Sequence, residues 1–160
     1  MDRDAEITAK FWKALRSDMT VMLGIGHAMR PMTAQLAEEE DHGPIWFFST
    51  VENDLVEGVG AGAKDAHISF VDKGHNLFAL VQGRLQVDTD RGMVDRLWNR
   101  YVAAWYEGGK EDPKLRLLRF DPKDAEIWLD ESSFLAGIKL MLGMDPKKDY
   151  AESKADVRLS

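Results

Sequence analysis

The chain has 160 residues, a formal net charge of −7, 44% hydrophobic and 31% charged residues, and no cysteine. This length and composition are typical of one globular domain, so we expect residues 1–160 to form a single domain. The acidic net charge and the scattered Lys and Arg residues argue against a surface for nucleic acid or for anionic membranes. The lack of cysteine excludes disulfides and thiol chemistry.

The first residues carry mixed charge and lack the apolar segment of a secretory signal. No apolar run approaches the ~20 residues that a membrane-spanning helix needs. We therefore expect a soluble, cytoplasmic protein.

The N-terminal segment, residues 1–17, predicts an amphipathic helix. Ile7, Phe11 and Leu15 recur every four residues, which places them on one face of a helix over 4–17. A short apolar strand over 20–25 follows.

Two stretches in the first third of the chain carry most of the information. We expect strands over 29–37 and 45–50 to pair as a β-hairpin, with an acidic loop between them. An arginine on the first strand and the hydroxyls of Ser49 and Thr50 at the end of the second suit a phosphorylated aromatic ligand, because they supply donors for its phosphate. The alternative from the pattern alone is a structural hairpin with an exposed arginine.

The middle of the chain predicts a short helix over 54–60 and a strand pair over 66–72 and 77–87. Gly83 lies inside the second of these strands, where a glycine suggests a bulge or a close approach of another group.

The last third predicts a helix from the cap at 88–90 to Tyr106, with apolar side chains every four residues. Two further strands, a final amphipathic helix and a polar tail are expected at 115–120, 125–129, 132–142 and 145–160. The helix and the tail together make up residues 131–160.

Common catalytic arrangements are missing from the sequence. The four histidines lack the spacing of metal ligands, so we expect no metal site. There is no G-x-S-x-G motif, and we identify no catalytic acid or base.

The order of several short motifs resembles one family. It runs through RPM, WFFST, LVQG, LW, AWY, DP and AEIW, which begin at Arg30, Trp46, Leu80, Leu97, Ala104, Asp112 and Ala125. This order is similar to that of the general stress protein subgroup of the pyridoxamine-phosphate-oxidase-like, FMN-binding split barrels. The resemblance implies a mainly-β split barrel of about six or seven antiparallel strands with three to four peripheral helices.

The resemblance also implies a homodimer in which two FMN sites form at the interface. If the protein is an enzyme, it is then a flavin-dependent oxidoreductase of unknown substrate. The side chains implied to bind the cofactor come from the two strands and from the aromatic end of the late helix: Arg30, Pro31, Met32, Thr33, Trp46, Phe48, Ser49, Thr50 and Trp105.

One stretch departs from the family pattern. Family members commonly carry a D-S-x-K stretch after the threonine, whose Ser and Lys hold the phosphate. Here Asp54 occupies the Ser position and Val56 the Lys position. An aspartate repels a phosphate dianion, and the missing lysine removes a charge-assisted contact. Lysines elsewhere are candidates to compensate: Lys64, Lys147, Lys148 and Lys154.

Two alternatives to FMN binding follow from this departure and from the fold. The first is a non-enzymatic dimeric binding module with a lost or altered flavin site. The second is a haem-binding split barrel, which needs a histidine near the dimer seam.

Overall fold

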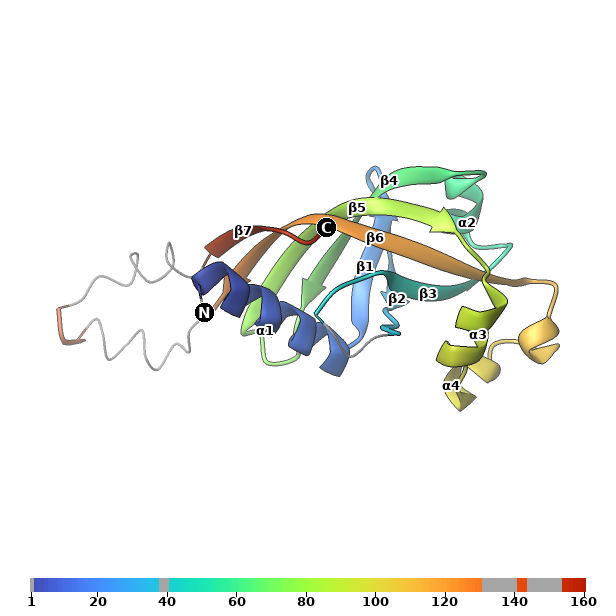
Figure 1. Cartoon of the computed structure of the whole chain (residues 1–160), viewed down its shortest axis with the longest axis horizontal. Coiled ribbons are helices and arrows are strands. Elements are labelled where there is room, and N and C mark those ends of the chain that lie inside the picture. Colours follow the sequence, from blue (N-terminus) through green and yellow to red (C-terminus); the bar gives the residue numbers. More distant parts are fainter. Residues whose placement is uncertain (1, 38–40, 131–140, 144–153) are drawn as a thin grey trace.

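The computed structural model describes residues 2–37, 41–130, 141–143 and 154–160. These residues form one sheet of seven antiparallel strands in the order β2-β1-β4-β5-β6-β3, with β7 also pairing β6 (Figure 1). The sheet does not close, so the predicted split barrel with peripheral helices is confirmed. The strands are β1 (Thr20–Ile25), β2 (Ala28–Thr33), β3 (Ile45–Thr50), β4 (Ala63–Val71), β5 (Leu77–Val87), β6 (Leu115–Leu129) and β7 (Lys154–Arg158).

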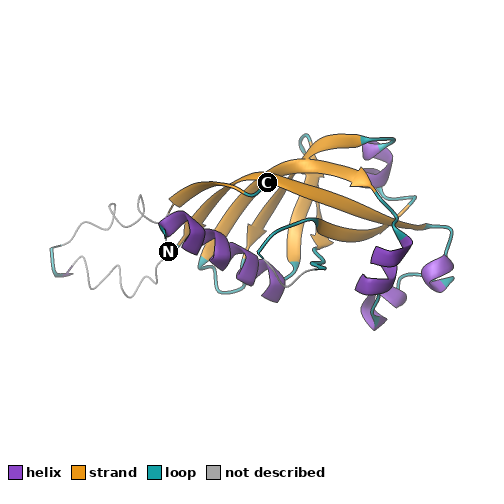
Figure 2. Ribbon diagram, viewed as in Figure 1, coloured by secondary structure: helices purple, strands orange, loops and turns teal. Residues whose placement is uncertain are grey.

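Four α-helices in the described residues flank the sheet, and Figure 2 shows α1 far from α3 and α4. Side-chain caps begin each helix, as in α1, where the Asp2 carboxylate accepts a 2.7 Å hydrogen bond from the Ala5 N–H. No described helix is long and apolar enough to cross a membrane. The helices are α1 (Arg3–Ser17), α2 (Asp54–Val59), α3 (Arg91–Leu97) and α4 (Arg100–Ala103), with a 3₁₀ turn at Gly109–Glu111.

The main core lies between α1 and one face of the sheet. The predicted face of α1 is buried, and Phe11 packs edge-on against Phe70 of β4, with ring centroids 6.3 Å apart. Alternate residues of β4, β5, β6 and β7 complete this core, as expected when one face of an antiparallel sheet is covered.

A second, smaller core lies under α3 and α4. Trp46 of β3 and Leu117 of β6 pack there with Val94 of α3 and Val102 of α4. This core fixes the two short helices beside the end of β3, where the candidate site is found.

The predicted bulge at Gly83 is confirmed, because the pairing of β5 with β6 shifts register between Gln82 and Gly83. A Cβ atom at Gly83 would lie 2.7 Å from the Phe120 ring. The expected break in the partner strand is wrong, since β6 continues through Asp121 and Pro122 as one strand of 15 residues. The bulge accommodates this stretch without ending the pairing.

The predicted pairing of the strands at 29–37 and 45–50 is also wrong, apart from one bridge between Gln35 and Trp46. β2 pairs with β1 along its whole length, and β3 pairs with β6. Only two residues separate β1 from β2, and one of them, Gly26, has a φ of +63°. This short turn favours a local hairpin over pairing with a strand that follows a longer loop.

The expected helix over 88–106 is two short helices. Trp98 and Asn99 have extended backbone between α3 and α4. The Asn99 side chain then accepts hydrogen bonds from the N–H groups of Tyr101 and Val102, at 2.9 and 3.0 Å, and so begins a new helix.

The predicted polar tail is wrong for its last residues, which form β7 with Ala155 and Val157 buried. The predicted final helix over 132–142 falls almost entirely outside the described residues, as do residues 145–153 of the tail.

Candidate functional site

A cavity opens where β2 and β3, the two ends of the strand order, diverge. A single bridge joins these edges, in which Gln35 and Trp46 exchange backbone hydrogen bonds of 2.8 and 2.9 Å. A continued antiparallel ladder would place Pro31 opposite Thr50, but no described residue pairs the strands there. Proline has no N–H to donate, so it is typical of an unpaired edge. The split therefore leaves a space between two strand ends.

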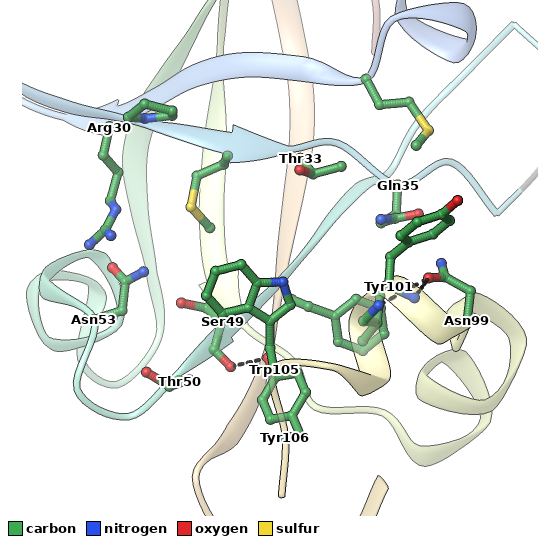
Figure 3. A pocket seen from close by; sticks show the side chains of 15 residues that line it. Arg30, Thr33, Gln35, Ser49, Thr50, Asn53, Asn99, Tyr101, Trp105 and Tyr106 are labelled. Atoms are coloured by element: carbon green, nitrogen blue, oxygen red, sulfur yellow. Dashed lines mark hydrogen bonds between the residues drawn. The ribbon is translucent and has the colours of Figure 1, made fainter. Parts of the chain in front are cut away.

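This cavity has a volume of about 600 Å³, within the range of small-molecule sites. Its walls come from β2, β3, the start of α2, and the region of α4, so residues far apart in sequence converge there (Figure 3). The lining residues are Met19, Arg30, Pro31, Met32, Thr33, Gln35, Phe48, Ser49, Thr50, Asn53, Asn99, Tyr101, Val102, Trp105 and Tyr106.

Every side chain that the sequence assigned to cofactor binding lines this cavity except Trp46. Trp46 is 4% exposed and belongs to the second core. Asp54 and Val56, at the positions of the family's phosphate ligands, do not line the cavity either. Asp54 is exposed in the first turn of α2, and Val56 packs against the main core. None of the four histidines lines it, which leaves the haem alternative without its required ligand there.

Sequence reasoning missed several lining residues, among them Gln35, Asn53, Asn99 and Tyr106. The two asparagines are helix caps, and a cap is a recognisable signal at the start of a helix. Gln35 lies two residues beyond Thr33 on an extended segment, so its side chain points to the same side as that of Thr33. Tyr106 comes after the end of α4 and follows no helical spacing.

Ser49 presents an unpartnered hydroxyl in this site. The residue is 5% exposed, and its Oγ has no hydrogen-bond partner among the described residues. A buried hydroxyl without a partner is unfavourable, because it has lost its hydrogen bonds to water. Ser49 is also one of the residues that line the cavity.

The backbone of the same residue is held by Tyr106. The Tyr106 hydroxyl donates a 2.6 Å hydrogen bond to the Ser49 carbonyl, and its ring packs against Phe48 and Trp98. Burial, together with the smaller effect of the nearby Asp112 carboxylate, raises the pKa of Tyr106 to about 12. Tyr106 is therefore a neutral donor in this bond at ordinary pH.

The loop after Tyr106 is closed by Asp112. Its carboxylate accepts hydrogen bonds from the backbone N–H groups of Gly108 and Lys114, at 3.0 and 2.9 Å. These two N–H groups lower the pKa of Asp112. Its exposed carboxylate stays charged and holds the loop that carries Tyr106.

Two aromatic side chains at the rim are open to solvent. Trp105 is 82% exposed and Tyr101 is 69% exposed, although both line the cavity. The Arg100 guanidinium lies 4.9 Å from the centre of the Tyr101 ring and donates a 2.9 Å hydrogen bond to its hydroxyl. Exposed aromatic rings beside a cavity provide a surface for a flat ligand or for a protein partner.

The donor set fits a flavin. A flavin phosphate needs a cation or N–H and O–H donors, and Arg30, Thr50 and the buried Ser49 hydroxyl lie in one cavity. Its ring needs flat apolar walls together with groups that donate and accept hydrogen bonds. The described residues contain no cluster of His, Cys, Asp or Glu side chains that converges as a metal site.

Comparison with protein families gives a match to the model "pyridoxamine 5'-phosphate oxidase like" over residues 6–149. No protein with a curated function matches the sequence.

Solved structures include similar chains. A general stress FMN/FAD binding protein from Xanthomonas citri is 55% identical, with 81% of this chain and 92% of that chain covered and a TM-score of 0.75. A protein assigned to the general stress family from Xanthomonas campestris is 54% identical, with 83% and 93% covered and a TM-score of 0.76. A protein assigned as general stress protein 26 from Jannaschia is 34% identical, with 96% and 99% covered and a TM-score of 0.81.

Proposed function

This chain belongs to the pyridoxamine 5'-phosphate oxidase-like family, and we propose that it binds FMN in the cavity between β2 and β3. The observation that carries the proposal is the buried, unpartnered Ser49 hydroxyl in a cavity that also holds the Arg30 side chain. The FMN/FAD-binding description of the similar Xanthomonas citri protein supports a flavin as the ligand.

The residues present would bind and orient the cofactor. Arg30 brings a positive charge, and the hydroxyls of Thr33, Ser49 and Thr50 bring hydrogen-bond donors. The Phe48 ring and other apolar side chains give the flat walls that a ring system needs. A bound flavin would supply electron and hydride transfer.

If the protein is an enzyme, it is an oxidoreductase whose chemistry belongs to the flavin. Among the lining residues, Tyr106 has a shifted pKa, and that shift keeps its hydroxyl protonated. A hydroxyl that already donates to a backbone carbonyl is a structural donor and is poorly placed to act as a general base. The protein's contribution is then to hold the flavin and to limit access of water.

We also propose a homodimer, because the sheet face opposite α1 carries exposed apolar side chains. Val71, Phe78 and Trp128 are direct cross-strand neighbours there, and Val71 and Phe78 are 43% and 37% exposed. Met22 of β1 lies on the same face and pairs with Pro31, which lines the cavity. A second copy on this face would bury the apolar row and cover the cavity mouth.

The second candidate is a dimeric binding module without enzymatic activity. It is favoured by the charge of the cavity, since Arg30 is the one charged side chain among the lining residues of the described chain. Neither Asp54 nor Val56 supplies the missing cation. In this case the fold and dimer persist while flavin binds weakly or another ligand replaces it.

The visible spectrum of the purified protein, followed by fluorescence titration with FMN, tests the proposal. We expect a yellow protein or, after removal of bound cofactor, saturable quenching of flavin fluorescence. A folded protein that is colourless and does not quench FMN contradicts flavin binding and leaves the binding module. A Soret band would indicate haem.

A further inference from the structure

The polar side chains of the cavity lie at two ends. At one end Arg30 extends from β2 toward Asn53, with Thr50 nearby (Figure 3). The opposite end of the cavity in this view holds Gln35, Asn99 and Tyr101, and the Trp105 ring is seen between the two groups (Figure 3). A ligand in this cavity therefore meets different polar groups at its two ends.

The Arg30 end mainly offers donors. In the described part of the chain the Arg30 side chain has no ion pair or hydrogen bond, so its guanidinium N–H groups are available. The Asn53 carbonyl oxygen already accepts a 2.8 Å hydrogen bond from the Leu55 N–H, which leaves its NH₂ group to donate. Unpaired donors suit an anion, because an anion only accepts.

The Gln35 end offers a group that both donates and accepts. The backbone N–H and C=O of Gln35 are used in the bridge to Trp46. Its side-chain amide has no hydrogen bond among the described residues, and a primary amide carries two donors and one acceptor oxygen.

The neighbouring amide is not equivalent. Asn99 accepts from Tyr101 and Val102 through its oxygen, and its NH₂ group donates to the Leu97 carbonyl at 3.3 Å. The Asn99 amide is therefore used in capping α4, and Gln35 has the amide that is available to a ligand at this end.

We infer that Gln35 is a ligand-binding residue that hydrogen-bonds the polar edge of the flavin ring, in a site where Arg30 holds the phosphate end. This inference rests on the proposed function and adds an orientation and a residue to it. The flavin ring edge alternates N–H and carbonyl groups, so it needs a partner that donates and accepts. An amide cannot neutralise a phosphate, and a guanidinium cannot accept from a ring N–H. The chemistry of the two ends thus fixes which end takes which part of the ligand.

Parallel titrations with FMN and riboflavin test the orientation, because riboflavin has the same ring and no phosphate. Gln35→Met keeps the side-chain length and removes the amide, so we expect the affinities for FMN and for riboflavin to fall by a similar factor, roughly tenfold. The absorption bands of the bound flavin should also shift in this variant. Arg30→Met should lower the affinity for FMN roughly tenfold or more and the affinity for riboflavin much less, so the FMN-to-riboflavin affinity ratio falls.

Gln86→Met is the matched control, since Gln86 does not line the cavity, and it should leave both affinities unchanged. Gln35→Glu retains the shape and should also weaken both ligands, which keeps the test available if the Met variant does not fold.

The outcomes distinguish a failure of the proposed flavin binding from a failure of the role proposed for Gln35. Wild-type protein that binds neither flavin contradicts the proposed function itself. Wild-type protein that binds both flavins while folded Gln35 variants bind equally well overturns the role of Gln35. A Gln35 variant that loses affinity for FMN alone overturns the orientation, because Gln35 would then lie at the phosphate end.

Discussion

The Tyr106 hydroxyl donates a 2.6 Å hydrogen bond to the Ser49 carbonyl, although the two residues are 57 positions apart in the sequence. This bond joins the segment after α4 to the strand that forms one wall of the cavity. Ser49 is thus fixed through its backbone, while its side-chain hydroxyl has no partner among the described residues.

Tyr106→Phe should destabilise the protein. The ring contacts with Phe48 and Trp98 remain, but the buried Ser49 carbonyl loses its donor, at a cost of about 1–3 kcal/mol. Urea unfolding measures this difference. Tyr101→Phe is the control, because the Tyr101 hydroxyl is exposed and its loss should change the unfolding free energy by less than about 0.5 kcal/mol. Equal stability of wild type and Tyr106→Phe would contradict the structural role of this bond.

The raised pKa of Tyr106 predicts a loss of stability in alkali. The folded state holds the phenol proton more tightly than the unfolded state, with a pKa of about 12 against 10.0. The corresponding stabilisation is complete below pH 10 and is lost as the pH rises from 10 through 12, up to about 2–3 kcal/mol. The free energy of unfolding, measured at several pH values, should therefore decrease more steeply above pH 10 in wild type than in Tyr106→Phe. An equal pH dependence of the unfolding free energy in wild type and Tyr106→Phe would show that Tyr106 does not titrate in this range.

Restoring the family's phosphate residues should raise the selectivity for FMN. The double change Asp54→Ser, Val56→Lys removes a negative charge and adds a positive one near the Asn53 side of the cavity. We expect the FMN-to-riboflavin affinity ratio to rise roughly tenfold or more at low salt and less at high salt. Fluorescence titration measures the ratio, and thermal melting checks that the half-buried Val56 position tolerates lysine.

Glu6→Lys on α1 is a control that changes the net charge by the same amount, and it should not alter the ratio. If the double variant melts normally and its ratio equals that of wild type, the phosphate lies away from α2.

Placing a charge on the exposed sheet face should break the proposed dimer. Phe78→Glu inserts a carboxylate between Val71 and Trp128, where a second copy would bury it unpaired. Sedimentation at micromolar concentration should show a dimer for wild type and a monomer of about 18.1 kDa for the variant. Lys13→Glu, on the exposed side of α1, should remain dimeric. A monomeric wild type would contradict the dimer.

Strand positions were largely predictable, because alternation of apolar and polar residues is a local property. β1 and β5 have the predicted bounds. The partner of β2 was not predictable in this way, since strand pairing depends on residues far apart in sequence. The signal for β7 was present in the alternation around Ala155 and Val157, but the charged residues that alternate with them, Lys154, Asp156 and Arg158, favoured a polar tail.

The late helix shows why spacing alone misleads. Leu97, Tyr101 and Trp105 recur every four residues, yet only Leu97 is buried, at 8% exposure. Asn99 interrupts the helix because its side chain competes with the preceding turn for backbone N–H groups. The aromatic residues beyond it are then free to line the cavity. Trp46 shows another limit, because it shares a face of β3 with Phe48 and Thr50, which line the cavity. Trp46 lies nearer the start of the strand, where the second core buries it.

The pairing of β7 with β6 has a consequence for the order in which the chain folds during synthesis. Ala155 and Val157 belong to the same core as Ile7 and Phe11 of α1, so α1 and β7 complete one core although they are far apart in the sequence. Until residues 154–158 have left the ribosome, the edge of β6 at 124–128 lacks its partner and part of the apolar face of α1 is uncovered. Exposed edges and apolar faces are what chaperones bind and what leads to aggregation. The nascent chain is therefore prone to aggregation in the interval between the synthesis of β6 and that of β7.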